Sequence, residues 1–255
     1  MNIYRLDQTA LAASVPSWVP EVRFLAETDS TNLDALRWAS EGAPEGCLVV
    51  ADYQRAGRGR LGRSWFAPPG TCLLFTLILR PRIDAGPHLG LINLAAAVAL
   101  CEALAEQEVE VSIKWPNDVN LADRKVAGVL SEHDEGVVCL GVGTNVNVGS
   151  FPGDIAGSAT SLSLNEGREF DRLRILVDVL ARFHLLYRDL PGRVPGEFRR
   201  WCGTLGTEVR VALPEGTLEG RALDIDSTGA LIMESGEVIS AGDVVHLRQR
   251  GEEDR

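Results

Sequence analysis

The segment from Gln54 to Phe66 concentrates the side chains best suited to chemistry on an anion. Three of its arginines, Arg58, Arg60 and Arg63, alternate with glycines, which allow unusual backbone dihedrals and a close approach to a ligand. Guanidinium groups are planar donors that match carboxylate and phosphate oxygens in bidentate pairs. Two aromatics end the segment, and they either anchor it or offer a face to a ring. The pattern predicts an ordered anion-binding loop, with a solvated arginine-rich turn as the alternative.

A second set of polar residues follows further along the chain. Lys114-Trp115-Pro116-Asn117-Asp118 places a cation, an amide and a carboxylate where a proline ends an expected strand, although a β-turn with an Asx cap explains the same residues. Lys125 stands at an expected strand start, where a lone lysine is usually solvated. Asn145 and Asn147 alternate with apolar residues, so we expect them on one face of a strand, either as a ligand wall or as an edge in water.

The composition excludes several kinds of partner. A net charge of −11 over 255 residues argues against a nucleic-acid surface, because binding a duplex depends on many Lys and Arg contacts to phosphate. The most apolar helical stretch, 89–104, is interrupted by Asn93 and Glu102, and the N-terminus has no export signal. We therefore expect no nucleic-acid partner and no membrane span.

The remaining reactive residues predict neither a metal site nor a covalent nucleophile. The five cysteines are far apart and form no C-x-x-C, which argues against a disulfide framework or a zinc site and favours a reducing cytoplasm. The four histidines have no mutual spacing suited to a metal or a catalytic dyad. Neither a G-x-S-x-G elbow nor a Walker A sequence is present.

These residues must be positioned by a mixed set of strands and helices. Asp29-Ser30-Thr31-Asn32 offers N-cap chemistry to a helix that ends near Gly42, with Leu33, Leu36 and Ala39 on one face. Strands over 47–52 and 71–79 are expected to flank the arginine-rich segment. The other expected elements are helices over 87–107, 170–190 and 195–201, strands over 22–25, 109–114 and 137–148, and a hairpin joining 119–121 to 125–130.

The two ends of the chain and one internal segment differ from this pattern. Residues 1–20 have weak periodicity and are expected to pack loosely, and residues 149–161 are rich in small residues and predict a flexible lid. From Thr207 onward, short strands separated by turn residues predict a small barrel. We therefore predict an α+β fold with a domain over 1–204 and a small domain over 205–255.

Five motifs together resemble the biotin protein ligases over residues 22–248. They are Asp29-Ser30-Thr31-Asn32, Gly57-Arg58-Gly59-Arg60-x-Gly62-Arg63-x-Trp65, Lys114-Trp115-Pro116-Asn117-Asp118, Lys125-Val126-Ala127-Gly128 and Gly141-Val142-Gly143-Thr144-Asn145-Val146-Asn147. The resemblance implies a mixed sheet covered by helices, as in class II synthetases, and an SH3-like C-terminal barrel. It also implies the activation of biotin by ATP with Mg²⁺ to biotinyl-5′-AMP, and transfer of biotin to a lysine of a biotin carboxyl carrier protein.

The resemblance also implies roles for particular residues. Lys125 and Arg60 would be catalytic, with Lys125 meeting the biotin carboxylate and the phosphoryl oxygens. The loop over residues 57–63 would fold over the ligand, and we expect it to be disordered without one. The implied biotin-binding residues are Ser30, Thr31, Asn32, Gln54, Arg58, Gly59, Arg60 and Lys125, and the implied nucleotide-binding residues are Arg63, Trp65, Asn117 and Asn145.

Some alternatives remain at the level of sequence. A lipoate or octanoate ligase shares the general chemistry, and a non-enzymatic module that stores biotin is a rival of another class. About twenty residues precede the first expected strand, too few for the DNA-binding domain of many bacterial relatives, so we expect no operator binding. Relatives often pair through a sheet edge, which makes a homodimer an open expectation.

Overall fold

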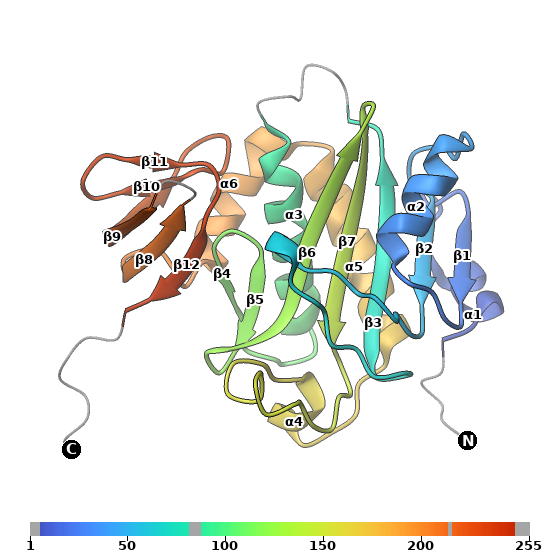
Figure 1. Cartoon of the computed structure of the whole chain (residues 1–255). Helices are drawn as coiled ribbons and strands as arrows, with labels where there is room; N and C mark the ends of the chain where they lie inside the picture. Colours follow the sequence, from blue (N-terminus) through green and yellow to red (C-terminus); the bar gives the residue numbers. More distant parts are fainter. Residues whose placement is uncertain (1–5, 82–87, 214–215, 248–255) are drawn as a thin grey trace.

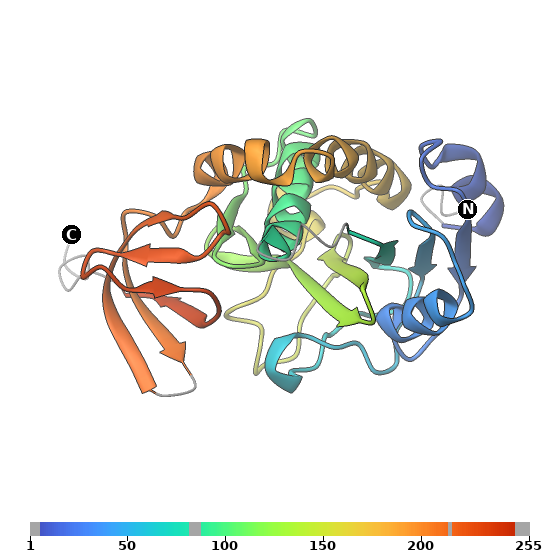
Figure 2. The same ribbon diagram turned by 90° about the horizontal axis from the view of Figure 1, so that it is seen from above.

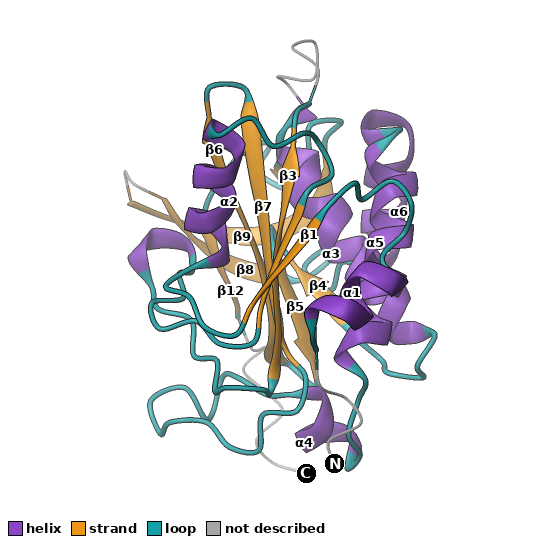
Figure 3. Cartoon of the chain, turned by 90° about the vertical axis from the view of Figure 1, so that its right-hand side faces the viewer, coloured by secondary structure: helices purple, strands orange, loops and turns teal. Residues whose placement is uncertain are grey.

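The computed structural model describes residues 6–81, 88–213 and 216–247, which form two β-sheets and the helices that cover the larger one. Three layers are visible when the large sheet is viewed edge-on (Figure 3). The helices α1, α3, α5 and α6 lie on one face of this sheet, and α2 lies on the other (Figure 2). The small sheet stands beside the β4 and β5 end of the large one (Figure 1). The expected α+β class is confirmed.

The large sheet has seven strands in the order β1-β2-β3-β7-β6-β5-β4. Its strands β1 and β2 are parallel, and every other neighbouring pair is antiparallel. The central strand β7 therefore lies between β3 and β6, so the motif residues at 141–145 on β7 are next to those at 125–128 on β6. The bounds are β1 (Val22–Leu25), β2 (Leu48–Ala51), β3 (Cys72–Leu79), β4 (Ser112–Lys114), β5 (Asp118–Leu121), β6 (Arg124–Asp134) and β7 (Val137–Asn145).

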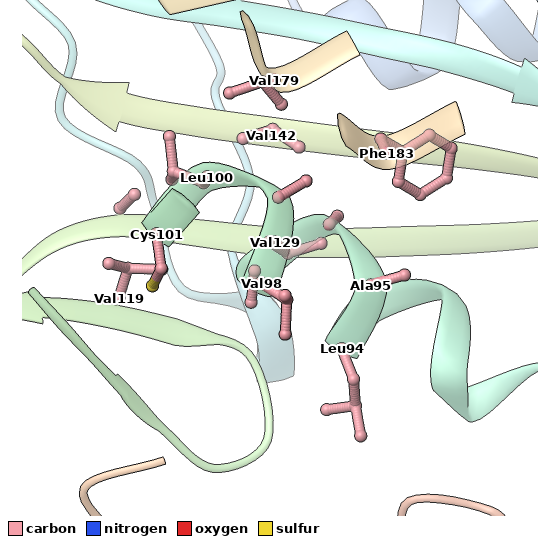
Figure 4. Packing of buried hydrophobic residues seen from close by; sticks show 14 of the residues in the cluster. Leu94, Ala95, Val98, Leu100, Cys101, Val119, Val129, Val142, Val179 and Phe183 are labelled. Atoms are coloured by element: carbon pink, nitrogen blue, oxygen red, sulfur yellow. The ribbon is translucent and has the colours of Figure 1, made fainter. Parts of the chain in front are cut away.

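The main core lies between the sheet and helix α3, which has no polar face over most of its length. Figure 4 shows Val98 and Cys101 of this helix packed among Val119, Val129 and Val142 of the strands. Because α5 and α6 cover its outer side, α3 is buried all round, as its composition predicts. The expected start at Pro87 lies outside the described residues. The helices are α1 (Gln8–Ser14), α2 (Thr31–Ser40), α3 (Gly90–Ala105), α4 (Leu162–Glu166), α5 (Arg172–Tyr187) and α6 (Leu190–Trp201).

The expectation that the N-terminal region packs loosely is wrong for residues 6–20. Leu6 and Leu11 have no exposed surface, and both belong to the main core. Gln8 on α1 also accepts a hydrogen bond from Phe24 N and donates one to Val22 O, so its amide occupies the outer edge of β1. Capping an edge strand in this way protects it from pairing with another chain. Apolar periodicity is weak in so short a helix, which explains why the sequence did not reveal it.

Helix α2 begins as expected but presents a different face. Ser30 occupies the N-cap position without a side-chain capping bond, and Gln54 Oε1 instead accepts a hydrogen bond from Thr31 N at 2.8 Å. Ala35 and Trp38 are buried together with Ala39, whereas the expected core residues Leu33 and Leu36 are only half-buried. The buried stripe thus begins at the two polar residues Thr31 and Asn32, which apolar periodicity cannot identify.

The expected hairpin at residues 119–130 is confirmed. Its turn residues Ala122 and Asp123 both have positive φ, which suits a tight two-residue turn, and Lys125 lies near the start of β6. The expectation that Asn147 shares a strand face with Asn145 is wrong, because β7 ends at Asn145. Asn147 instead donates to Phe170 O and accepts from Phe170 N, so it fixes the approach to α5.

The C-terminal strands form one antiparallel sheet in the order β11-β10-β9-β8-β12. Trp115 joins this sheet to the large one, because its side chain is buried and its Nε1 donates to Gly229 O at 3.0 Å. Its backbone N donates to Thr204 Oγ1 at 3.0 Å. An SH3-like closure of this sheet stays a prediction. The strands are β8 (Glu208–Leu213), β9 (Gly216–Ile225), β10 (Leu231–Met233), β11 (Val238–Ile239) and β12 (Asp243–His246).

Within the described ranges, every helix is too short or too polar to cross a membrane. The five cysteines are free and buried. Burial raises the pKa of the Cys72 thiol to about 12, so this cysteine stays protonated near neutral pH.

Candidate active site

One cavity of about 480 Å³ contains all twelve residues that the sequence predicts for the site. Such a volume suits a drug-sized ligand. The arginine-rich segment lies on the same side of the large sheet as α2 (Figure 2), and residues of both line the cavity. Its lining includes five cationic side chains and three carboxylates, although the whole chain is strongly acidic. The cations are Arg58, Arg60, Arg63, Lys114 and Lys125, and the carboxylates are Asp118, Asp123 and Asp243.

One wall of the cavity, which we call the α2 wall, consists of Ser30, Thr31, Asn32 and Gln54. Both the backbone N and the Oγ1 of Thr31 donate to Gln54 Oε1, at 2.8 and 3.0 Å. Asn32 Oδ1 accepts a hydrogen bond of 2.6 Å from Thr76 Oγ1, and Thr76 has no exposed surface. Buried polar groups that are all hydrogen-bonded hold fixed positions. This wall can therefore present donors and acceptors to a neutral polar group without rearranging.

The floor of the cavity is made by glycines on β6 and β7. A Cβ at Gly141 would lie 2.2 Å from Asn32 Oδ1, and a Cβ at Gly143 would lie 2.8 Å from the Trp65 ring. Because alternate residues of a strand share a face, these two glycines remove side chains from one continuous strip of β7. Asn32 and Trp65 occupy the space so created. The glycines of this motif thus serve packing of the site rather than a turn.

The opposite wall is the arginine loop, residues 57–65. The loop folds on itself, since Trp65 N donates to Gly57 O at 2.8 Å and Gly59 N donates to Arg63 O at 2.7 Å. Its tip holds the short turn η1 (Arg60–Gly62), where Leu61 has a φ of 56° and is largely exposed. Most of the loop's side chains are exposed, so it is held over the cavity by few contacts.

Arg60 is the most firmly placed side chain of the arginine loop. Its Nη1 donates to Asn117 Oδ1 at 2.9 Å, and its Nη2 donates to Gly242 O at 3.2 Å in the segment before β12. Asn117 in turn donates to Val129 O at 2.6 Å. Burial lowers the pKa of the Arg60 guanidinium, and nearby Asp118 and Asp243 oppose this effect. Arginine nevertheless remains charged at neutral pH.

Lys125 lies across the floor from the arginine loop and is paired with Asp118. Its Nζ is 2.6 Å from Asp118 Oδ1 and 5.5 Å from the centre of a Trp65 ring. The backbone of Lys125 is bonded to the segment after β7. Its N donates to Ser158 O, and its O accepts from Thr160 N. The lysine is therefore fixed at its backbone while its ammonium group can exchange one anionic partner for another.

Four of the five cations that line the cavity have partners among the residues that the structure describes, and three of these partners are carboxylates. Arg58 pairs with Glu132, Arg63 with Asp243, and Lys125 with Asp118. These pairs are partly exposed, so each contributes only about 0–1 kcal/mol of stability and can open. A ligand that carries a carboxylate and phosphates would replace the protein carboxylates at little energetic cost. Protein carboxylates thus occupy the positions beside these cations that the anionic groups of a ligand would take.

Sequence reasoning identified residues that line the cavity but missed three residues that hold them in position. Asn145, on the nucleotide side of the expected site, lines the cavity while its Nδ2 donates to Thr160 O at 3.1 Å. Thr76, Glu132 and Asp243 were not anticipated. Thr76 could have been noticed as the polar exception in an apolar strand, whereas nothing in the sequence signals that Asp243 approaches Arg63.

Comparison with known families places this site in a defined class of ligases. The model of the "Biotin/lipoate A/B protein ligase family" matches residues 24–148, and that of the "Biotin protein ligase C terminal domain" matches residues 204–247. A solved structure of the Aquifex aeolicus biotin protein ligase in complex with biotin and ATP has a TM-score of 0.79 and 32% identity, covering 90% of this chain and 100% of that one. The fold is thus that of the biotin and lipoate protein ligases.

Sequence relatives narrow the class further. The biotin--[acetyl-CoA-carboxylase] ligase of Mycobacterium tuberculosis is 36% identical over 236 residues, covering 88% of each chain. The bifunctional ligase/repressor BirA of Bacillus spizizenii is 39% identical over 223 residues, covering 82% of this chain and 68% of that protein. This chain belongs to the biotin protein ligase family.

Proposed function

We infer that this chain is an ATP-dependent, AMP-forming ligase that converts biotin to biotinyl-5′-AMP and transfers the biotinyl group to a lysine of a biotin carboxyl carrier protein. The observation that carries this inference is the single cavity in which the hydrogen-bonded α2 wall faces Arg60 and Lys125. Its neutral wall suits the polar ring of biotin, and its cations suit a carboxylate that meets a triphosphate. The family membership of the chain supports the same reaction.

In the first step, a carboxylate oxygen of biotin attacks the α-phosphorus of ATP and pyrophosphate leaves. Two anions must approach each other, so cationic groups have to offset their repulsion and the charge that develops on the phosphoryl oxygens. We assign this role to Lys125 and Arg60, whose protein partners are Asp118 and Asn117. Because Asn117 accepts from Arg60, it positions that guanidinium. Trp65 borders the adenine side, together with Arg63 and Asn145.

In the second step, the neutral amine of the acceptor lysine attacks the carbonyl carbon of the mixed anhydride, AMP leaves, and the amine loses a proton. The anhydride must be kept from water until the carrier protein arrives. The arginine loop and the segment that contains Phe151 and Ile155 both border the cavity and can exclude water from it. No covalent enzyme intermediate is required, which agrees with the lack of a nucleophile motif in the sequence.

Mg²⁺ is implied by the use of ATP. Magnesium in such sites is bound mainly by substrate phosphates and water, with one or two carboxylates. Over the described residues, no group of three or more His, Cys, Asp and Glu side chains forms a metal site by itself, but the carboxylates Asp118 and Asp243 line the cavity. This donor set fits a metal that enters with ATP. When bound, Mg²⁺ would neutralise charge on the phosphate oxygens.

The proposal is tested by measuring pyrophosphate release from ATP and Mg²⁺ after addition of biotin, of lipoate, or of neither. We expect release with biotin alone, followed by labelling of a carrier domain detected with streptavidin. Release with lipoate in place of biotin would identify a lipoate ligase. Binding of biotin by calorimetry without any pyrophosphate release would identify a storage module and overturn the proposal.

A further inference from the structure

Glu132 lies on β6 just outside the cavity, and the proposed reaction leaves it without a role. It follows Gly128 and Leu130 at alternate positions of β6, so it shares the face of the strand that carries the site. Its carboxylate accepts from Arg58 Nη2 at 3.0 Å and from Asn32 Nδ2 at 2.8 Å. One carboxylate therefore contacts both the arginine loop and the α2 wall.

The contact with Asn32 continues into the buried network. Asn32 Oδ1 accepts from Thr76 Oγ1, which lies 2.8 Å from Thr31 Oγ1, and Thr31 is bonded to Gln54. Polar contacts therefore connect Arg58 in the loop with Thr31, whose backbone N donates to Gln54 Oε1. Asn32 Nδ2 also donates to Leu130 O at 3.3 Å, so both hydrogens of this amide have acceptors on β6.

The contact with Arg58 is an anchor for the first half of the arginine loop. Arg58 lies between two glycines, which give the backbone no side-chain contacts of its own there. Arg60 and Arg63 tie the second half of the loop to Asn117 and to the segment before β12. Glu132 thus holds Arg58 at the side of the loop next to the α2 wall, whereas Arg60 is held by Asn117 and Gly242.

We propose that Glu132 is a positioning residue that couples closure of the arginine loop to the α2 wall, and so retains biotinyl-5′-AMP between the two half-reactions. This inference rests on the proposed function. When biotin occupies the preformed α2 wall, it holds the Asn32 amide, and through that amide the Glu132 carboxylate that receives Arg58. When Arg58 is bound, the Asn32 amide is held for biotin in return. Loss of Glu132 therefore affects ligand retention more than the chemical step.

The test compares Glu132→Gln, Arg58→Gln and the double variant with the wild type. Labelled biotinyl-5′-AMP is bound, excess unlabelled ligand is added, and the release of label is followed. We expect each single variant to release the adenylate about three- to tenfold faster, and the double variant to be no faster than the worse single one, because contacting partners are not additive. In Glu132→Gln, KM for biotin should rise by a similar factor, while kcat for pyrophosphate release should change less than twofold, which corresponds to about 0.4 kcal/mol in activation free energy.

Two further variants complete the design. Glu132→Asp keeps the charge and should therefore retain the adenylate better than Glu132→Gln does. Asp134→Asn removes an exposed carboxylate two residues further along the same face of β6, and this control should release the adenylate at the wild-type rate. Wild-type release by Glu132→Gln, or additive effects in the double variant, would overturn the inference. Failure of the wild type itself to form biotinyl-5′-AMP would instead refute the proposed function.

Discussion

The α2 wall and the arginine loop face each other across the cavity, and they differ in burial and in what holds their side chains. Thr31 and Asn32 are buried and bonded through neutral groups, including the fully buried Thr76. Arg58 and Arg63 are about half exposed and are held by ion pairs. Buried hydrogen bonds fix a geometry before the ligand arrives, whereas exposed ion pairs open easily. The wall is thus suited to recognising biotin, and the loop to closing and reopening in each catalytic cycle.

The comparison also shows how the protein keeps cationic groups ready for an anionic ligand. In the absence of ligand, charged groups would repel one another or take up arbitrary positions. Protein carboxylates on β5, β6 and β12 hold them in place at a small energetic cost. Substitutions in the loop should therefore change activity with little effect on stability, and substitutions in the wall should change both.

The largest effect is expected for the cations that meet the reacting centre. Lys125→Ala and Arg60→Ala should each lower the rate of pyrophosphate release at least about a hundredfold, because each removes a charge that stabilises the transition state. Stopped-flow measurement with saturating biotin and ATP gives the rate. Arg55→Ala is the matched control, since Arg55 pairs with Glu27 and Asp29 outside the cavity. A rate close to that of the wild type in either variant would remove that residue from the catalytic set.

A substitution in the floor should break the α2 wall. Gly141→Ala would place a Cβ 2.2 Å from Asn32 Oδ1, so Asn32 must move away from Thr76 and Glu132. We expect KM for biotin to rise about tenfold or more and the free energy of unfolding to fall by about 1–3 kcal/mol. Steady-state kinetics and urea unfolding measure the two quantities. Gly149→Ala, with open space around its Cβ, should change neither, and an unchanged KM in Gly141→Ala would mean that the wall is not preformed.

A loop substitution should show the opposite profile. Arg63→Gln removes an exposed cation paired with Asp243, so the free energy of unfolding should change by no more than about 1 kcal/mol. KM for ATP should rise severalfold, and the rise should be larger at low salt, where exposed charges are screened least. Kinetics at two salt concentrations provide the measurement, with Arg37→Gln on α2 as the control. An unfolding energy lowered as much as in Gly141→Ala would contradict the distinction between loop and wall.

The smallest effect concerns His246, which lies at the seam between the two sheets and in neither wall. Partial burial of its ring lowers its pKa below the usual 6.5, nearby Lys114 lowers it further, and Asp123 opposes them; because the residue remains exposed, solvent screens these effects. The folded protein therefore favours the neutral ring. The contribution of His246 to the free energy of unfolding is fully present above about pH 6.5 and is lost as the pH falls through the lower pKa of the folded state. His246→Gln should weaken the pH dependence of unfolding between pH 7.5 and about 5 by less than about 1 kcal/mol. An identical pH dependence in urea unfolding of both proteins would show that His246 does not contribute.

The fold could be predicted to a large extent because its elements have strong local signals. The apolar helix α3 and the hairpin at Ala122 and Asp123 follow from composition and turn chemistry. Helix α1 could not be predicted, since its burial depends on contacts with distant strands. The buried face of α2 was predicted only in part. Ala39 is buried and Leu36 packs against the same cluster, but buried Thr31 and Asn32 do not look like core residues until their partners are known.

The candidate site could be predicted through its motifs, which give residue types but not pairings. The α2 wall and the two cations proposed to be catalytic were expected near one another, and one cavity holds them. Trp115 and Asn147, which belong to the same motifs, hold other parts of the fold instead. The counter-ions Glu132 and Asp243 come from segments far along the chain, so only the folded structure brings them to the arginines.

The central claim is that this cavity makes biotinyl-5′-AMP, and mass spectrometry tests it most directly. The protein is incubated with biotin, ATP and Mg²⁺, freed of small molecules by rapid gel filtration, and analysed for bound nucleotide. We predict biotinyl-5′-AMP retained in near-equal amount with the protein, and none with Lys125→Ala. Finding ATP and biotin bound but unreacted in the wild-type protein would contradict the account.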